Sequence, residues 1–183
     1  MRIIAGLAKG RRIAAPPGSD VRPTGDRVRE ALFSSLQALL PGAHVLDLYA
    51  GSGALGLEAA SRGAAHVTLV ERDHRTLAVL RDNVEVVGLS GVEVVAGEVA
   101  AILAGAPPPG APFDLVLADP PYLLSDAEVA AMLHALLPHL AADATVIVER
   151  GSRQGAVSWP AGLTPAEPRR YGTTVLHRAQ LVA

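Results

Sequence analysis

The chain has 183 residues, of which 50% are hydrophobic, and it carries no cysteine and a formal net charge of −2. This length predicts a single domain with a substantial core, and the lack of cysteine excludes disulfides and thiolate metal ligands. No apolar run reaches the ~18 residues that a membrane span needs, and charge and glycine follow Met1 too soon for a signal peptide, so we expect a cytoplasmic protein.

The first 30 residues form a basic arm. They carry seven basic and three acidic groups, whereas the rest of the chain carries nine basic and fifteen acidic ones. Residues 2–6 and 10–14 are expected to pair as a β-hairpin around a glycine turn. The arm is either a solvated edge or a contact for a polyanion. For the second case, the RNA-binding candidates are Arg2, Lys9, Arg11 and Arg12.

An amphipathic helix is predicted next, over residues 26–40, because Val28, Leu32, Leu36 and Leu39 share one face. From residue 43 onward, short apolar runs alternate with longer amphipathic stretches. The predicted strands are residues 43–48, 66–71, 92–96, 113–118 and 144–149. The predicted helices are residues 54–62, 74–87 and 125–137. This order predicts an α/β fold with a parallel sheet and helices on both faces, followed by a loop at 150–168 and an extended run at 173–182.

The segment Asp119-Pro120-Pro121-Tyr122 directly follows the predicted strand at 113–118. Each proline fixes its own φ and lacks an N–H, and Pro121 also restricts Pro120 to extended geometry. The neighbouring carbonyls are therefore held outward as acceptors, beside one carboxylate and one flat ring. This set of groups suits a planar base with an exocyclic amino group. The ring would stack on the base, and the carboxylate and carbonyl would accept hydrogen bonds from its amino group. The alternative is a plain turn in which Tyr122 is a packing residue.

A glycine-rich loop, Asp47–Gly56, joins the strand at 43–48 to its helix. Gly51 and Gly53 let the backbone turn sharply and approach a ligand, and with Gly56 they also match the dinucleotide pattern G-x-G-x-x-G. Glu71 ends the next strand, where a carboxylate can bind both hydroxyls of a ribose. The loop alone therefore fits NAD as well as S-adenosylmethionine.

Asp47 separates these two cofactors, because its carboxylate would repel a pyrophosphate but attract the cationic ammonium and sulfonium of S-adenosylmethionine. Together with the segment at 119–122, it favours the methionine-derived cofactor. The alternative for Asp47 is a cap for a turn or helix. Glu98, after the strand at 92–96, is a candidate contact for the adenine amino group, or else a cap for the helix that follows.

With these residues in place, the chain resembles the class I S-adenosylmethionine-dependent methyltransferases. It is most similar to the RsmD family, which methylates the N2 amino group of a guanine in bacterial 16S ribosomal RNA. The resemblance is carried by residues 22–33, 45–56 and 119–122. It implies a Rossmann-like, mostly parallel seven-stranded sheet in one methyltransferase domain over 1–183. Within this domain, residues 1–20 would be a hairpin extension of a catalytic core at 21–183.

The resemblance also implies roles for single residues. Thr24 with Arg27 or Arg29 would close over the amino-acid end of the cofactor; the alternative for the two arginines is a solvated first helical turn. Glu98 departs from the family, in which Asp is more usual. The candidate cofactor-binding residues are Thr24, Arg29, Asp47, Tyr49, Gly51, Gly53, Glu71, Arg72 and Glu98. The candidate catalytic residues, which would hold the guanine, are Asp119, Pro120 and Tyr122.

The expected partner is 16S ribosomal RNA within the small subunit or an assembly intermediate, and the expected protein is a monomer that needs neither a metal nor a membrane. Two other amino-group methyltransferases share the 119–122 pattern, acting on DNA adenine or protein glutamine. DNA enzymes generally carry a further base-reading domain, and a glutamine methylase has no need of the basic arm. A non-catalytic RNA-binding module and an NAD oxidoreductase are the remaining alternatives.

Overall fold

The computed structural model describes residues 1–16 and 23–182, without the side chains of residues 23 and 24. The strands are β1 (His44–Leu48), β2 (His66–Glu71), β3 (Val92–Ala96), β4 (Phe113–Ala118), β5 (Leu140–Gly151), β6 (Leu163–Pro165), β7 (Arg169–Tyr171) and β8 (Thr174–Leu181). The helices are α1 (Pro23–Leu36), α2 (Ala54–Ser61), α3 (His74–Val87), α4 (Val99–Ala104) and α5 (Asp126–Leu136). Two 3₁₀ turns, η1 (Gln37–Leu39) and η2 (Leu137–His139), follow α1 and α5.

The strands form one sheet in the order β3-β2-β1-β4-β5-β8-β6, with β7 beside β8. The pairs from β3 to β5 are parallel, and β6, β7 and β8 join antiparallel. The chain order along the sheet reverses between β1 and β4. In open parallel sheets, ligands bind beyond the carboxyl ends of the strands at such a reversal. The segments after β1 and β4 therefore meet at the expected place for a site.

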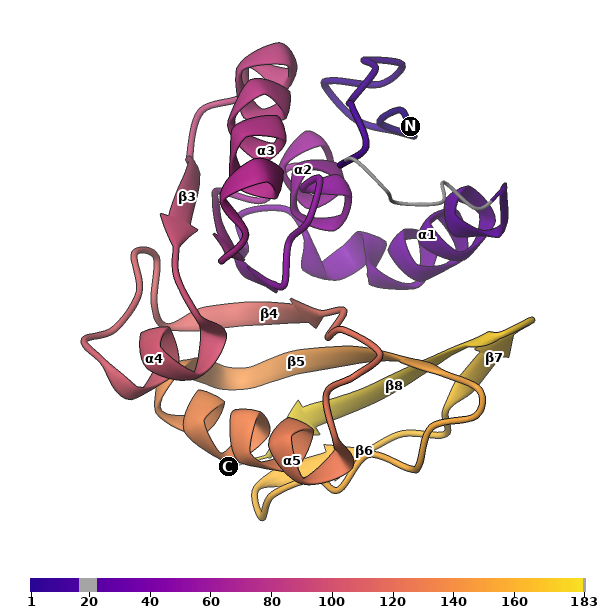
Figure 1. Cartoon of the computed structure of the whole chain (residues 1–183), viewed down its shortest axis with the longest axis vertical. Coiled ribbons are helices and arrows are strands. Elements are labelled where there is room, and N and C mark those ends of the chain that lie inside the picture. Colours follow the sequence, from indigo (N-terminus) through magenta and orange to yellow (C-terminus); the bar gives the residue numbers. More distant parts are fainter. Residues whose placement is uncertain (17–22, 183) are drawn as a thin grey trace.

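The sheet separates two helical layers, as Figure 1 shows: α1, α2 and α3 lie on one side of it, and α4 and α5 on the other. Alternate residues of a strand point to opposite faces. Val45 of β1 accordingly packs in the core under α1–α3, and Leu46 packs in the core under α4 and α5. Both side chains are fully buried. Helices on both faces were predicted from the alternating order, and this prediction is confirmed.

The sheet differs from the prediction in its strand number, which is eight rather than seven. The predicted loop at 150–168 contains β6, and β7 lies just beyond it. Each of these strands has three residues, too few to show the alternation from which a strand is predicted. The helix α4 was also not among the predicted helices, and at six residues it is similarly short. Among the described helices, none is long and apolar enough to span a membrane.

The predicted pairing of the N-terminal segments is confirmed, although neither segment is long enough in pairing to form a full strand. Arg2 and Arg12 form an isolated antiparallel bridge, and Ile3 N donates to Arg11 O at 2.9 Å. The backbone of the arm also bonds to α2, where the buried Glu58 carboxylate accepts hydrogen bonds from Ile4 N at 2.7 Å and Ala5 N at 3.0 Å. A buried carboxylate is stable only when it is paired and hydrogen-bonded, and Arg62 Nε completes its shell at 2.7 Å. The arm is therefore fixed to the helix that follows the glycine loop.

Asn83 of α3 links the same arm to the glycine loop. Its buried side-chain amide donates to Ser52 O at 2.8 Å and to Ala14 O at 2.9 Å, and its Oδ1 accepts from Ala14 N at 2.8 Å. One amide thus satisfies three backbone groups from two segments that are distant in the sequence. The N-terminal arm and the glycine loop are held in a fixed relation.

Candidate active site

The glycine loop leaves β1 in an unusual backbone conformation. Tyr49, Gly51 and Gly53 have φ values of 64°, 57° and 80°, and this left-handed region favours glycine. At Gly56, further along the loop, there is no room for a side chain, because a Cβ would lie 2.2 Å from Leu69 Cδ2. Glycines therefore both turn the chain and let α2 pack closely on β2, as in nucleotide-binding loops.

Asp47 lies at the base of this loop and is only 1% exposed. Its Oδ2 accepts a hydrogen bond from Gly56 N at 2.8 Å, so one oxygen caps the start of α2. Its Oδ1 is buried and has no hydrogen-bond partner among the described residues. Burial disfavours the charged form and raises the pKa of Asp47 to about 7. The cap interpretation is therefore confirmed for Oδ2, and cofactor binding by Oδ1 remains a prediction.

Glu71 at the end of β2 holds the loop from the other side. Its Oε2 accepts from Gly51 N at 3.0 Å, and its Oε1 accepts from the backbone N–H groups of Arg72 and Asp73 at 2.8 and 2.9 Å. Three backbone donors fix the orientation of this carboxylate before any ligand arrives.

Two adjacent cavities open beyond the carboxyl ends of the strands. The smaller, of about 140 Å³, is lined by Glu71, Arg72, Gly97 and Glu98 among others, and the larger, of about 460 Å³, by Asp47, Gly51, Arg29, Glu149 and Thr174 among others. Tyr49 and Asp119 line both. The cofactor loop and the segment after β4 thus meet where the two cavities join, as the strand order predicts.

Asp119 stands at this junction, directly after β4. Its surface is open to the cleft, and its side chain makes no hydrogen bond with the described part of the chain. The surrounding protein nevertheless limits its hydration, which raises the pKa of Asp119 above its usual value, and the charges of Glu149 and then Asp47 add to this effect. A carboxyl group held in this way can accept hydrogen bonds and also hold a proton near neutral pH.

The ring of Tyr122 is 63% exposed and lies beside the same cleft. Its position depends on Gly151, where a Cβ would lie 2.9 Å from Tyr122 Cε1. Gln154 Nε2 donates to Tyr122 O at 3.1 Å, which fixes the backbone of the turn. The buried Pro120 sits between the acid and the ring. An exposed ring on a fixed backbone is suited to stacking, and the contact of Tyr122 with a base remains a prediction.

The loop after Tyr122 is anchored by Arg150 of β5. Its Nη2 pairs with Asp126 Oδ1 at 2.6 Å, and its Nη1 donates to Leu124 O at 3.3 Å. The start of α5 is fixed as well, because Ser125 and Glu128 form a full capping box. The position of the acceptor segment is thus set from both of its ends.

Three further predicted cofactor residues line the two cavities, and Arg29 is the buried one among them. Arg72 and Glu98 are exposed and form an ion pair at the mouth of the smaller cavity. Glu98 occupies the N-cap position of α4, as the capping alternative predicts, but its side chain makes no capping hydrogen bond there. Arg29 lines the larger cavity, but its Nη2 donates to Arg2 O at 2.6 Å and to Asp26 Oδ1 at 3.0 Å. Its contact with the cofactor remains a prediction, and the side chain of Thr24 lies outside the described residues.

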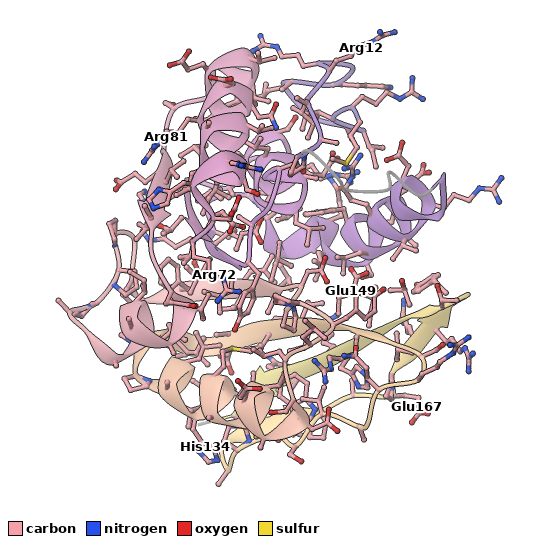
Figure 2. The ribbon with its side chains drawn as sticks, viewed as in Figure 1. Arg12, Arg72, Arg81, His134, Glu149 and Glu167 are labelled. Carbon is pink, nitrogen blue, oxygen red and sulfur yellow. The ribbon has the colours of Figure 1, made fainter. Side chains whose placement is uncertain are left out.

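The RNA-binding candidates divide into two kinds. Arg2, Lys9 and Arg12 are exposed on the arm, and Figure 2 shows Arg12 at the outer end of the molecule, away from the cleft. Arg11 instead donates to the carbonyls of Val86 and Val87 at the end of α3. This arginine stabilises a helix C-terminus, a role that the count of charges could not reveal.

Glu149 was missed as a site residue although it ends a predicted strand, as Glu71 does. Figure 2 shows it between α1 and the end of β5, facing the larger cavity. Thr174 of β8 donates to its Oε1 at 3.4 Å. The neighbouring strand ends β1, β4 and β5 therefore contribute Asp47, Asp119 and Glu149 to one cleft. The signal that could have identified Glu149 is its place at the carboxyl end of a strand beside β4.

Comparisons with known proteins agree with this architecture. The structure of a putative methyltransferase yhhF from Escherichia coli matches with a TM-score of 0.88 and 34% identity, over 100% of this chain and 98% of that one. The putative methylase HI0767 from Haemophilus influenzae matches with a TM-score of 0.79 and 30% identity, over 100% and 98% of the two chains. The fold and the glycine loop thus define a class I methyltransferase.

The family model described as Conserved hypothetical protein 95 matches residues 1–180. Ribosomal RNA small subunit methyltransferase D of Escherichia coli K12 is 38% identical over 161 residues, which cover 88% of this chain and 80% of that protein. The protein of the same description from Haemophilus influenzae is 38% identical over 134 residues, covering 73% and 69%. The chain belongs to this family, the RsmD family, and the resemblance read from its sequence is confirmed.

Proposed function

We propose that the protein transfers a methyl group from S-adenosylmethionine to the N2 amino group of a guanine in 16S ribosomal RNA of the small subunit. The observation that carries this proposal is the place of Asp119 and Tyr122, an acceptor and an exposed ring at the junction of two cavities. The ribosomal substrate is supported by the relatives named ribosomal RNA small subunit methyltransferase D.

The residues of the two cavities fit S-adenosylmethionine. Glu71, fixed by three backbone donors, would bind the ribose hydroxyls, and the smaller cavity beside Glu98 would take the adenine. The buried Oδ1 of Asp47, which has no hydrogen-bond partner among the described residues, would accept from the ammonium group. When bound, S-adenosylmethionine supplies an electrophilic methyl group on a sulfonium.

Asp119 would do the chemistry at the acceptor nitrogen. The lone pair of a guanine amino group is delocalised into the ring, which makes it a weak nucleophile. Hydrogen bonds from this group to the Asp119 carboxylate and the Pro120 carbonyl favour a pyramidal nitrogen and stabilise the positive charge that develops on it. Because the cleft raises the pKa of Asp119, its carboxylate can also hold the proton that the nitrogen loses.

Guanine, rather than adenine, suits the two carboxylates of the acceptor cleft. Its Watson–Crick edge presents adjacent donors at N1 and N2, whereas adenine presents an acceptor at N1. Asp119 and Glu149 both line the larger cavity and could each accept one of these donors. Since this edge is inaccessible in a stacked duplex, the target base must be splayed out of a loop or helix end.

We further propose that the protein works as a cytoplasmic monomer of one domain, without a metal ion, on the small subunit or an assembly intermediate. The basic arm, with Arg2, Lys9 and Arg12 exposed, would contact the RNA backbone.

The test is methyl transfer to small subunits from an Escherichia coli strain that lacks its own methyltransferase D, with tritiated S-adenosylmethionine and mass-spectrometric analysis of nucleosides. We expect label in N2-methylguanosine. Label in N6-methyladenosine, or in protein glutamine, would show another acceptor. A calorimetric titration without any S-adenosylmethionine binding would instead support the non-catalytic module.

A further inference from the structure

A third cavity, of about 540 Å³, lies between α1 and the β6–β8 part of the sheet. Its floor is apolar, with Leu32 of α1, Ile147 of β5 and Leu176 of β8. Its rim carries Tyr171 and two arginines, Arg169 and Arg178. We call this cavity the α1–β8 groove. It is larger than either cavity of the active site and holds none of the candidate residues described above.

The α1–β8 groove continues the catalytic cleft. Leu32 lines both the groove and the larger cavity of the active site. On β5, Ile147 lines the groove and Glu149 the active site, and residues two apart on a strand share a face about 7 Å from one another. The hairpin of β7 and β8 likewise contributes Tyr171, the last residue of β7, to the groove and Thr174, the first residue of β8, to the active site. A strand that enters the cleft has a direct path into the groove.

The charge of this region is opposite to that of the catalytic body. Residues 31–150 carry five basic and fourteen acidic groups, whereas residues 151–183 carry four basic groups and one acid, Glu167. Arg169 and Arg170 are exposed and Arg178 is half-buried. None of the ion pairs formed by the described residues includes these three arginines. Unneutralised guanidinium groups at the edge of an apolar groove favour a ligand with both flat apolar parts and anionic groups.

We propose that the α1–β8 groove binds the nucleotide next to the target guanine in the same RNA strand, with its base against Tyr171 and its phosphates near Arg169 and Arg178. A base that is flipped out of a stack leaves its neighbour without a stacking partner. An aromatic ring and an apolar floor offer that neighbour a replacement, and arginines offer contacts to its backbone. This inference rests on the proposed function, since it concerns the same RNA.

The test compares Arg169→Gln and Arg178→Gln with Arg81→Gln. Arg81 is an exposed arginine of α3 that Figure 2 shows on the opposite side of the molecule, which makes it a matched control. With small subunits from the methyltransferase D deletion strain, each groove variant should raise KM for the subunit roughly tenfold. Both kcat and the Kd for S-adenosylmethionine should stay unchanged. The plot of log affinity against log salt has a negative slope, and this slope should become shallower by about 0.7 for each phosphate that the variant no longer binds.

Each outcome separates this inference from its rivals. Absence of methyl transfer by the wild-type protein would sink the proposed function, whereas normal transfer by wild type and both variants, with equal KM and salt slope, would overturn the groove alone. A raised KM for whole subunits with unchanged binding and salt slope on protein-free 16S RNA would mean that the groove faces a ribosomal protein, which also overturns it. Tyr171→Leu, which keeps an apolar side chain, should weaken binding to protein-free RNA without altering the salt slope. Thermal melting of each variant checks that it is folded.

Discussion

The cofactor side and the acceptor side of the cleft are built in opposite ways. On the cofactor side, the carboxylates of Asp47 and Glu71 are bound by backbone N–H groups from the glycine loop and the end of β2. On the acceptor side, the Asp119 side chain has no hydrogen bond with the described residues, and the Tyr122 ring is largely exposed. On the cofactor side a single buried oxygen, Asp47 Oδ1, has no hydrogen-bond partner among the described residues, whereas on the acceptor side the whole Asp119 carboxyl group has none.

This difference assigns the two sides different tasks. In the proposed function, acceptors that are already oriented would bind a small cofactor without a cost of reorganisation. The open acid and ring would receive a base that arrives from a folded RNA, and the protein fixes only the backbone that carries them. Changes on the acceptor side should alter transfer and RNA binding, whereas changes on the cofactor side should alter cofactor affinity.

The strongest test of this division is Asp119→Asn, which removes the charge and keeps the shape. We expect the rate of methyl transfer to fall by about 10²–10³-fold, because the developing charge on the nitrogen loses its carboxylate. Cofactor affinity, measured by calorimetry, should change little. The division would be wrong if Asp119→Asn kept full turnover with tritiated S-adenosylmethionine, or if its cofactor binding fell to the same extent as transfer.

Tyr122→Ala should have the next largest effect, and it should weaken only the binding of RNA. Loss of a stacked ring costs about 1–3 kcal/mol per base, so we expect KM for the small subunit to rise roughly thirtyfold. Tyr122→Phe keeps the ring and should stay near the wild-type value, which makes it the control. Equal losses in the two variants would point to the hydroxyl group rather than to stacking.

The same contrast explains which parts could be predicted from the sequence. The cofactor side comes from short stretches, in which Asp47, the glycines and Glu71 keep a spacing that local geometry imposes. The parallel strands and four of the helices show clear periodicity for the same reason. The acceptor side joins Asp119 to Glu149 and Thr174 across three strands, and only the sheet order brings these residues together. The role of Arg11 at the end of α3 likewise depends on a contact across 75 or 76 positions.

A smaller effect should appear in the pH dependence of cofactor binding. The raised pKa of Asp47, about 7, leaves its carboxyl mostly neutral at pH 6 and mostly ionised at pH 8 in the protein without ligand. A cationic ammonium group requires the ionised form, so we expect affinity to increase about tenfold over this range and then level off. The free energy of unfolding of the protein without ligand should decrease as pH rises from about 4 to 7. Over this range the Asp47 carboxyl ionises in the unfolded chain but is still protonated in the folded one.

Calorimetry of S-adenosylmethionine binding at pH 6, 7 and 8 measures this dependence. These titrations are best done with the Asp119→Asn variant, because the substitution removes Asp119, the other carboxyl group whose pKa is raised. Asp47→Asn in the same background should bind more weakly and show no trend with pH. A trend that persists in this double variant would assign the titration to another group.

The smallest effect should come from the rim of the adenine cavity, where Arg72 and Glu98 pair with side chains 62% and 54% exposed. Exposed ion pairs contribute little to stability, so Arg72→Ala should leave both the melting temperature and cofactor affinity nearly unchanged. Glu98→Ala breaks the same pair but also removes the acceptor predicted for the adenine amino group. We expect it to weaken S-adenosylmethionine binding about threefold more than Arg72→Ala does, in parallel calorimetric titrations. If the two variants bind equally well, Glu98 makes no contact with adenine, and the fixed part of the cofactor side ends at Glu71.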